Sequence, residues 1–268
     1  MSQPPEHVLE EDQPKGVRRI TLNRPDKRNA FDASIIAQLT RAFTAAEDNP
    51  EVRLVILCAS GKHFSAGADL EWMQATASMS ESENRGEADD ARQLANLMRV
   101  LDDMSKPVIA RVQGAAFGGA LGLVCCADIA VAERAARFCL REVRLGLVPA
   151  TIGPYVVRAM GHRQARRYML TAEVMDADTA RDLGLVHEVM ADETLDEGVE
   201  AVCHALLQGG PDAQGYCKKL LQRLDDPAGD SAVDEFTAEM IAAARTGSEG
   251  QEGLRAFLHK DSPRWRTE

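Results

Sequence analysis

The sequence is poor in aromatic residues, at 4%, and has no apolar run long enough to span a membrane. A membrane-spanning helix needs about 20 consecutive apolar residues. The longest candidate, 114–131, is rich in glycine and is interrupted by Asp128. Residues 1–14 are polar and acidic, and they lack the apolar core of a signal peptide. We therefore expect a soluble cytoplasmic protein that does not enter the membrane.

Basic residues are outnumbered, since 31 Lys and Arg stand against 42 Asp and Glu, and the formal net charge is −11. Such a charge repels phosphate backbones and argues against nucleic-acid binding. The six cysteines form no C-x-x-C pair, and no set of Cys, His and Asp has metal-ligand spacing, so we expect buried reduced thiols and no metal. Neither G-x-G-x-x-G nor G-K-[ST] occurs, so the common nucleotide motifs are excluded.

The first half of the chain switches between a strand period and a helix period. Alternation over 17–22 and apolar runs over 52–59 and 108–112 predict strands. Apolar positions at helical spacing predict helices over 32–47 and 89–104. The order strand, helix, strand, helix, strand indicates an α/β fold with crossover connections.

The second half begins with small residues over 114–122, which lead from a turn into a helix, and short strands are expected at 128–133 and 137–142. From about residue 163 the chain becomes mainly helical. We expect a core over residues 1–200 and a helical C-terminal region over 201–268. Helices are expected at 165–171, 177–183, 195–207, 214–224, 232–244 and 248–258, and a mobile polar surface segment at 76–92.

Two clusters of small residues follow strands, at 65–69 and at Gly118-Gly119. Glycine permits unusual dihedrals and close backbone approach, so each cluster alone is also compatible with tight packing. At the start of a helix, however, free N–H groups favour negative charge. Together the clusters could place two N–H donors around one oxygen, which is the arrangement of an oxyanion hole.

Several ordered motifs give this chain a resemblance to the crotonase (enoyl-CoA hydratase/isomerase) superfamily over roughly residues 15–262. The motifs are NRPDKRNA at 23–30, FSAGADL at 64–70, KPVIARVQG at 106–114, GG at 118–119 with ADI at 127–129, AEVMDA at 172–177 with GLV at 184–186, and AFLHK at 256–260. The resemblance implies a spiral of ββα turns with a C-terminal helical region used for trimerisation. It also implies an acyl-CoA substrate, in which coenzyme A enters as part of the substrate rather than as a cofactor, and a homo-trimer or a hexamer built as a dimer of trimers.

The resemblance further implies the residues of the site. The N–H groups of Ala66 and Gly119 are expected to hold the thioester oxygen. Two preorganised donors in a dry site stabilise an enolate more than its ground state, and removing one typically costs about 3 kcal/mol. The expected coenzyme A contacts are Lys27, Arg28 and Ala30 along the pantetheine and diphosphate, Ala68, Asp69 and Leu70 on the adenine side, and Phe257 and Lys260, which in many relatives reach the site of a neighbouring subunit.

Two positions concern acid–base chemistry. On the family pattern Glu142 is the retained catalytic glutamate, although from the residues alone it could be a surface carboxylate paired with Arg141 or Arg144. Hydratases of this family usually carry a second glutamate at the position of Gly122. One glutamate suffices to move a proton during double-bond isomerisation, whereas hydration also needs a positioned water.

The segments at 63–73, 114–123 and 138–147 are similar to a bacterial branch described as 3-methylglutaconyl-CoA hydratases of leucine degradation or carboxygeranoyl-CoA hydratases. This similarity implies a lyase that hydrates or dehydrates a branched carboxylated acyl-CoA, of the 3-methylglutaconyl-CoA / 3-hydroxy-3-methylglutaryl-CoA type. Gly122 would leave space for the acyl chain. Its carboxylate would then help to hold the water and would meet a basic residue, for which Arg141, Arg144 and Arg158 are candidates.

Two alternatives remain open. An isomerase would shift a double bond on an acyl-CoA with Glu142 alone. A non-catalytic RNA-binding relative is the other, because a eukaryotic member of this branch binds AU-rich RNA, but the charge of −11 argues against it. His63 could touch a phosphate or serve as a structural histidine, and Trp72-Met73 could line the acyl pocket or belong to the core.

Overall fold

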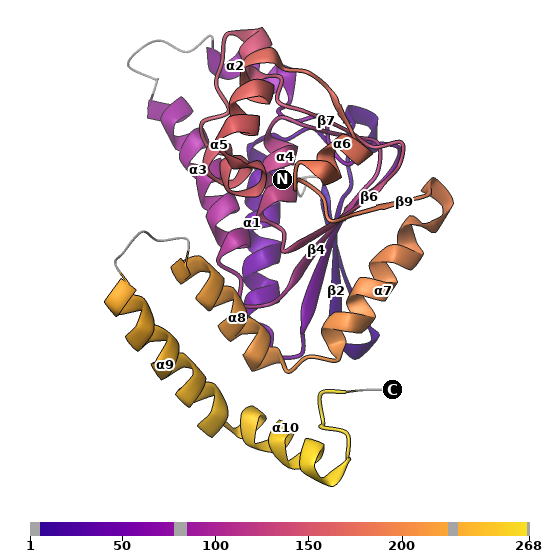
Figure 1. The fold of residues 1–268 in the computed structure, drawn as a ribbon. Coiled ribbons are helices and arrows are strands. Elements are labelled where there is room, and N and C mark those ends of the chain that lie inside the picture. The colour runs from indigo at the N-terminus through magenta and orange to yellow at the C-terminus, as the bar shows by residue number, and fades with distance from the viewer. Residues whose placement is uncertain (1–5, 78–84, 225–229, 267–268) are drawn as a thin grey trace.

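Within the residues that the computed structural model describes, 6–77, 85–224 and 230–266, six strands form the larger sheet (Figure 1). Their order is β1-β2-β3-β4-β6-β9, and all neighbours are parallel except the antiparallel pair β1 and β2. The strands are β1 (Val8–Gln13), β2 (Val17–Leu22), β3 (Leu54–Ala59), β4 (Val108–Val112), β6 (Ile129–Glu133) and β9 (Glu188–Met190).

A second, smaller layer repeats beside the first. It contains β5 (Ala115–Phe117), β7 (Arg137–Cys139) and β8 (Met175–Asp176), and isolated bridges at Phe31↔Ala68 and Ser65↔Ala116 extend it. Each turn of the chain therefore runs through a long strand, a short extended segment in the second layer, and then a helix. This is the spiral of ββα turns that the sequence resemblance predicts, so the predicted fold class is confirmed.

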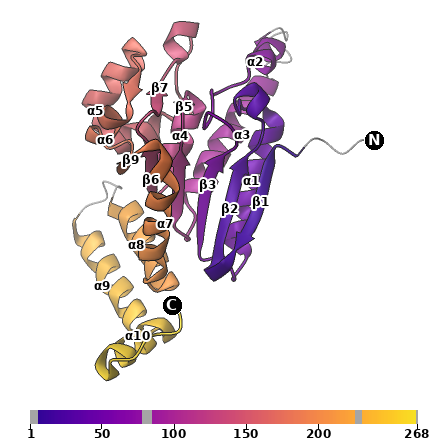
Figure 2. The ribbon, with the colours of Figure 1, turned by 90° about the vertical axis from the view of Figure 1, so that its right-hand side faces the viewer.

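Helices cover both faces of the larger sheet. On one face α1 (Ala33–Asp48) and α3 (Arg85–Asp102) pack against each other and bury residues such as Phe43 and Leu97. On the other face α7 (Leu195–Leu207) packs on β4, β6 and β9 and buries Leu195 and Val199 (Figure 2). Every residue of β3 is buried, as a strand covered on both faces requires.

The C-terminal helices α8 (Pro211–Leu224), α9 (Asp230–Thr246) and α10 (Ser248–His259) extend beyond one end of the larger sheet (Figures 1 and 2). Helices α9 and α10 pack mainly on α8 and on each other. Helix α7 runs across residue 200, where the sequence places the border of the helical region; that division and the role of the region in trimerisation stay predictions. The shorter helices are α2 (Leu70–Ala77), α4 (Gly119–Cys126), α5 (Gly153–Thr171) and α6 (Ala177–Asp182), with 3-10 turns at Pro14–Gly16, Pro25–Lys27, Glu142–Leu145 and Asp192–Thr194.

The structure corrects several element boundaries. Of the surface segment expected at 76–92, residues 76–77 end α2 and residues 85–92 lie in α3, whereas 78–84 lie outside the described residues. Helix α5 begins at Gly153, about ten residues before the predicted helical half, and changes direction at Gly161, where φ is 74°. The strand expected over 137–142 ends at Cys139, because Arg141 already has helical dihedrals.

Five elements escaped the sequence pattern, namely the strands β1, β5, β8 and β9 and the helix α2. The reasons are clear for β1 and α2. Strand β1 is an edge strand with one antiparallel neighbour. Four of its six side chains are exposed and three of these are charged, so it shows no apolar alternation. Helix α2 is short and follows Asp69, whose carboxylate accepts from the Glu71 N–H at 2.9 Å and caps the helix.

The cysteines agree with the prediction of buried reduced thiols in the main. All six are unpaired, and four are buried, while Cys125 is half-buried and Cys217 is exposed. Burial raises the pKa of Cys125 to about 12 and that of Cys126 still further, so these thiols are poor nucleophiles at neutral pH. Within the part of the chain that the structure describes, no helix is both long and apolar enough to cross a bilayer.

Candidate active site

The second layer brings the predicted site segments side by side. The Phe31 N–H donates to the Gly67 carbonyl oxygen at 2.7 Å, and the Phe117 N–H donates to the Ser65 carbonyl oxygen at 3.0 Å. The loop after β3 therefore lies between the loop after β2 and strand β5. Three segments far apart in sequence meet because successive turns of the spiral stack in this layer.

The prediction that the Ala66 N–H is the first donor is wrong. That N–H donates to the Arg28 carbonyl oxygen at 3.0 Å, so it is already satisfied. Two residues further on, Ala68 forms a parallel β-bridge with Phe31, in which the Phe31 N–H donates to the Gly67 carbonyl oxygen and the Asp69 N–H donates to the Phe31 carbonyl oxygen. In such a bridge the N–H of Ala68 itself is directed away from Phe31. This N–H has no acceptor among the described residues, and Ala68 is exposed. The free donor of the motif is therefore Ala68.

The second donor lies where it was expected. Gly118 has φ 54° and ψ −127°, a conformation suited to glycine, and its N–H donates to the Cys139 carbonyl oxygen at 2.9 Å. Gly119 then begins α4, and its N–H has no acceptor in the parts of the chain that the structure describes. The two loops touch, because a Cβ on Gly118 would lie 3.9 Å from Gly67 Cα. Ala68 and Gly119, whose N–H groups are unsatisfied, each follow one of the two glycines in contact, and the helix dipole lies behind Gly119.

Glu142 completes this cluster. One carboxylate oxygen, Oε1, lies 3.2 Å from the point that a Cβ of Gly118 would occupy. The other, Oε2, is buried and has no hydrogen-bond partner among the described residues, where Glu142 also forms no ion pair. Burial raises the pKa of this carboxyl above its usual value. The alternative of a surface carboxylate paired with Arg141 or Arg144 is therefore not what the structure shows.

The three candidate arginines are held by other groups. Arg158 pairs with Asp102 in a different cavity, which excludes it from the cluster around Glu142. Arg144 Nη2 donates to the Ala172 carbonyl oxygen at 2.8 Å. The Arg141 guanidinium lies over the Phe117 ring, 4.1 Å from its centroid. Arg141 and Arg144 remain candidates, since both are exposed and flank Glu142 in sequence.

Gly122 does not leave space for an acyl chain, and this prediction is corrected. Gly122 is buried, and a Cβ there would overlap Ile152 Cγ2 and lie 3.0 Å from Met98 Sδ. Ile152 and Met98 are themselves buried, at 1% and 0% exposure. The volume that a side chain would fill is thus already occupied by apolar atoms of α3 and of the residue before α5.

The residues expected along coenzyme A lie in and next to the two donor loops, and the exposed ones define the solvent-facing, outer side of these loops. Lys27 is exposed, and its Nζ lies 2.7 Å from Glu71 Oε1, while Leu70 is 64% exposed and Ala30 is buried. Asp69 is buried, and its carboxylate is used by Arg24 at 2.9 Å and by N–H groups at the start of α2. Asp69 therefore holds the loop in place and does not present its carboxylate to a ligand.

A cavity of about 320 Å³ adjoins these loops and is lined by Arg28, Lys62 and His63 among others. Lys62 was not predicted as a site residue. Its position just before the motif at 64–70 is the sequence feature that could have indicated it. His63 is half-buried, and its Nδ1 accepts from the Ala115 N–H at 3.2 Å, so it ties the loop after β3 to β5. Of the two roles considered from the sequence, a phosphate contact and a structural histidine, this bond gives His63 the structural one.

Phe257 and Lys260 are not brought together with the donors of the same chain. Phe257 is 82% exposed near the end of α10, and Lys260 follows that helix. Figures 1 and 2 place α10 at the opposite end of the molecule from α2, which begins beside the Ala68 loop. Their expected contact with a neighbouring subunit's coenzyme A stays a prediction.

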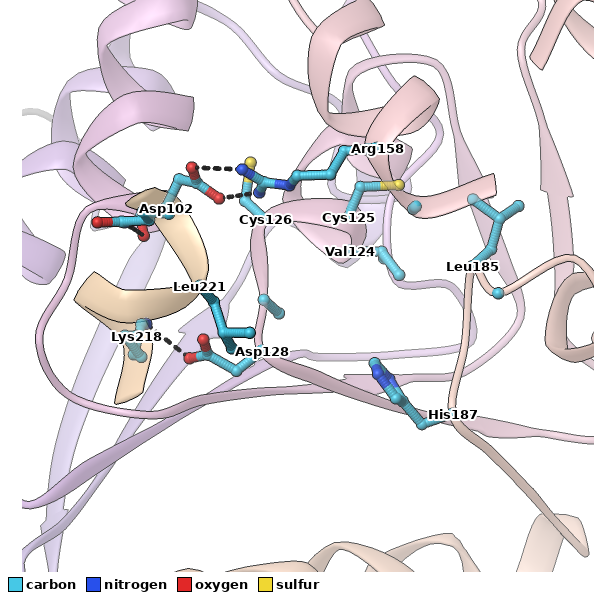
Figure 3. A pocket seen from close by; sticks show the side chains of 14 residues that line it. Asp102, Val124, Cys125, Cys126, Asp128, Arg158, Leu185, His187, Lys218 and Leu221 are labelled. Atoms are coloured by element: carbon cyan, nitrogen blue, oxygen red, sulfur yellow. Dashed lines mark hydrogen bonds and ion pairs between the residues drawn. The ribbon is translucent and has the colours of Figure 1, made fainter. Parts of the chain in front are cut away.

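A second charged cavity, of about 380 Å³, lies between α8 and the ends of α3 and α4 (Figure 3). Arg158 Nη1 lies 3.0 Å from Asp102 Oδ2, and Lys218 Nζ lies 2.7 Å from Asp128 Oδ2. Asp128 also accepts from the Val108 N–H at 2.7 Å. These charges are paired within the protein: Lys218 fastens α8 to the core, and Arg158 joins α5 to the end of α3. The charged groups of this cavity therefore have a structural role.

Two free backbone donors beside a buried, unpaired carboxylate suit an enzyme that stabilises charge on a carbonyl oxygen while a carboxylate moves a proton. The chain belongs to the enoyl-CoA hydratase/isomerase family, whose sequence model matches residues 12–268.

Relatives of known sequence or structure agree with this assignment. An enoyl-CoA hydratase from Shewanella pealeana has a similar crystal structure, with 47% identity, a TM-score of 0.92, and coverage of 97% of this chain and 96% of that one. The enoyl-CoA hydratase ACTT6 of Alternaria alternata is 34% identical over 91% of this chain and 79% of its own length. A trans-2-decenoyl-[acyl-carrier-protein] isomerase of Streptococcus mutans is 28% identical over 93% of this chain and 94% of its own length. Hydratase/isomerase-type chemistry is therefore supported.

Proposed function

We propose that this protein hydrates an α,β-unsaturated acyl-CoA through an enolate, with Glu142 as the single acid/base. The observation that carries this proposal is the Glu142 carboxylate, whose Oε1 faces Gly118 and whose Oε2 is buried without a partner among the described residues. Buried polar atoms are normally satisfied, and the exceptions gather at sites that bind or react. A water or a substrate proton would supply the missing partner.

The reaction follows from the three groups. The ionised Glu142 takes a proton from water as the water oxygen bonds to the β-carbon. The electron pair of the double bond moves to form the enolate, whose oxygen receives the N–H groups of Ala68 and Gly119. Glu142 then returns the proton to the α-carbon, which gives the 3-hydroxyacyl-CoA. Dehydration is the reverse, and water is the only co-reactant.

The proposed ligand is an acyl-CoA with its polyanionic part on the outer side of the donor loops. Lys27, Arg28 and Lys62 are exposed there, and two of them line the cavity of about 320 Å³. A local group of cations can hold phosphates although the whole chain carries −11. We further propose the trimer or hexamer described above, with Phe257 and Lys260 reaching a neighbour's coenzyme A.

For the acyl group we propose a branched, carboxylated chain of the 3-methylglutaconyl-CoA type. The similarity of the segments around Ala68, Gly119 and Glu142 to that bacterial branch supports it. The wall at Gly122 is apolar and filled, so a second protein carboxylate does not hold the water there. The substrate's own carboxylate would share that task with Glu142, and Arg141 or Arg144 would bind it.

Turnover in ¹⁸O-labelled water tests the proposal. We expect labelled oxygen in the product and a higher kcat/KM for 3-methylglutaconyl-CoA than for crotonyl-CoA. Equal kcat/KM values would refute the carboxylated substrate but leave the hydratase. Full activity of Glu142→Gln would refute the single-acid mechanism.

An isomerase is the second candidate, and the filled wall at Gly122 favours it. Isomerisation needs only one glutamate, which moves a proton from one carbon of the acyl chain to another, and it needs no bound water. In that case a 3-enoyl-CoA would convert to the 2-enoyl-CoA, with solvent deuterium at the receiving carbon. No ¹⁸O would enter the product, and this result separates the two reactions.

A further inference from the structure

Two ion pairs join the loop after β2 to the start of α2, and they differ in depth. Arg24 Nη1 lies 2.9 Å from Asp69 Oδ2, and these side chains are only 15% and 7% exposed. Lys27 Nζ lies 2.7 Å from Glu71 Oε1, with 41% and 77% exposure. An exposed pair of this kind is weak and exchanges its partners readily. The inner pair, Arg24–Asp69, therefore holds the two segments together, whereas the outer pair, Lys27–Glu71, can open.

The outer pair borders the approach to the free N–H of Ala68. On the inner side this approach is closed, because Phe31 is 2% exposed and Asp69 is 6% exposed. On the outer side Ala68 itself is exposed and Leu70 is 64% exposed. A thioester whose oxygen reaches Ala68 must extend over this outer edge, where Lys27 and Glu71 meet.

We propose that Glu71 competes with the substrate's diphosphate for Lys27, so that ligand binding moves the Lys27 ammonium from the carboxylate to a phosphate oxygen. This inference rests on the proposed acyl-CoA ligand. A phosphate oxygen and a carboxylate oxygen are equivalent acceptors for an ammonium, and the released Glu71 is exposed enough to be solvated by water. Glu71 therefore sets affinity for the polyanionic part of the ligand without touching the reacting atoms.

The variant Glu71→Gln tests the exchange. Its amide cannot hold the ammonium as an ion pair, so Lys27 is free before the ligand binds. We expect coenzyme A to bind about two- to fivefold more tightly by calorimetry, since an exposed pair contributes roughly that factor. Thermal unfolding should be almost unchanged. An unchanged or weaker affinity would overturn the proposal.

A matched control separates this exchange from a general change in charge. Glu11 on β1 is exposed, lies outside the cavity beside the donor loops, and forms no ion pair within the described parts of the chain. Glu11→Gln therefore adds the same charge without releasing Lys27, and it should leave the affinity near the wild-type value. An equal gain in both variants would assign the effect to the overall field and refute the competition.

Three probes locate the phosphate that Lys27 meets. The gain in Glu71→Gln should persist for dephospho-coenzyme A, which retains the diphosphate, and should vanish for pantetheine, which has no phosphate. A gain that needs the 3′-phosphate would refute the diphosphate as partner. In a Lys27→Gln background the second change, Glu71→Gln, should have no effect, and a surviving gain would also refute the exchange.

These measurements do not depend on turnover. A chain that shows this binding pattern but converts no enoyl-CoA would refute the enolate chemistry and keep the competition. If neither wild type nor Glu71→Gln binds coenzyme A, the competition is refuted.

Discussion

Two regions of this molecule contain carboxylates beside a cavity or a loop contact, and they differ in whether those carboxylates have partners. In the cavity of Figure 3, Asp102 pairs with Arg158 and Asp128 pairs with Lys218. Beside Gly118, by contrast, Glu142 has a buried oxygen without a partner. The first region gains stability from its charges, whereas the second holds a charge at a cost to stability. The comparison indicates that a carboxylate without a partner marks the reactive region better than the presence of charged side chains does.

The largest effect is expected for Glu142→Gln, which should lower kcat by about 10²–10⁴ while raising the melting temperature at neutral pH. Burial raises the pKa of Glu142, so the folded state prefers the protonated carboxyl. The stability that this group contributes is therefore present below its usual pKa and lost as pH rises through the raised value.

The gain from Glu142→Gln should accordingly be about 1–3 kcal/mol at pH 7, from removing an unsatisfied buried charge. It should shrink as pH falls from neutral through the raised pKa of this carboxyl, and it should be absent below the carboxyl's ordinary pKa. Steady-state kinetics and thermal unfolding between pH 4 and pH 8 measure both effects. A variant that loses activity and stability together would break the comparison.

The two N–H groups of the 64–70 motif offer a paired test with a somewhat smaller effect. Replacing Ala68 by L-lactate removes its N–H and keeps its side chain, and kcat should fall by about 10²–10³. The same replacement at Ala66 removes the bond to the Arg28 carbonyl oxygen and should cost about 1 kcal/mol of stability with kcat largely kept. The reverse pattern would restore Ala66 as the donor.

Position 122 tests whether the apolar wall is closed. Gly122→Ala should destabilise the fold by about 1–3 kcal/mol, because its Cβ would overlap Ile152. In an Ile152→Ala background the same change should cost less, since space has been opened. Chemical unfolding of the four proteins measures this coupling, and additive effects would show that Ile152 does not fill the position.

The smallest catalytic effect is expected in the cavity of Figure 3. Asp128→Asn keeps an acceptor for the Val108 N–H but loses the ion pair with Lys218, whose side chain is 12% exposed. We expect a loss of about 1–2 kcal/mol in stability and an almost unchanged kcat. Lys218→Met is the matched variant. A large fall in kcat with the fold intact would contradict the division between the two regions.

The spiral fold and the second donor could be predicted from the sequence because they depend on local patterns and ordered motifs. Gly118-Gly119 follows a strand and opens a helix, and a helix start leaves its N–H groups free whatever lies elsewhere. Strand β1 could not be found in this way, since its charged side chains face solvent at the edge of the sheet.

The identity of the first donor and the role of Gly122 depend on residues that are distant in sequence. A local sequence pattern could therefore not predict them. The bond from the Ala66 N–H to the Arg28 carbonyl oxygen and the bridge between Ala68 and Phe31 together decide that the free N–H belongs to Ala68. A glycine in sequence suggests empty space, but Ile152, thirty residues away, fills it.

The contact between Gly122 and Ile152 also limits how this chain can evolve. A glutamate cannot enter position 122 first, because it meets Ile152 and Met98 in a closed interior. Ile152 would have to shrink beforehand, and truncating a buried isoleucine typically costs about 2–5 kcal/mol. Descendants that acquire a second carboxylate at position 122 in this order pass through a less stable ancestor, so the packing of Ile152 is a barrier to that change.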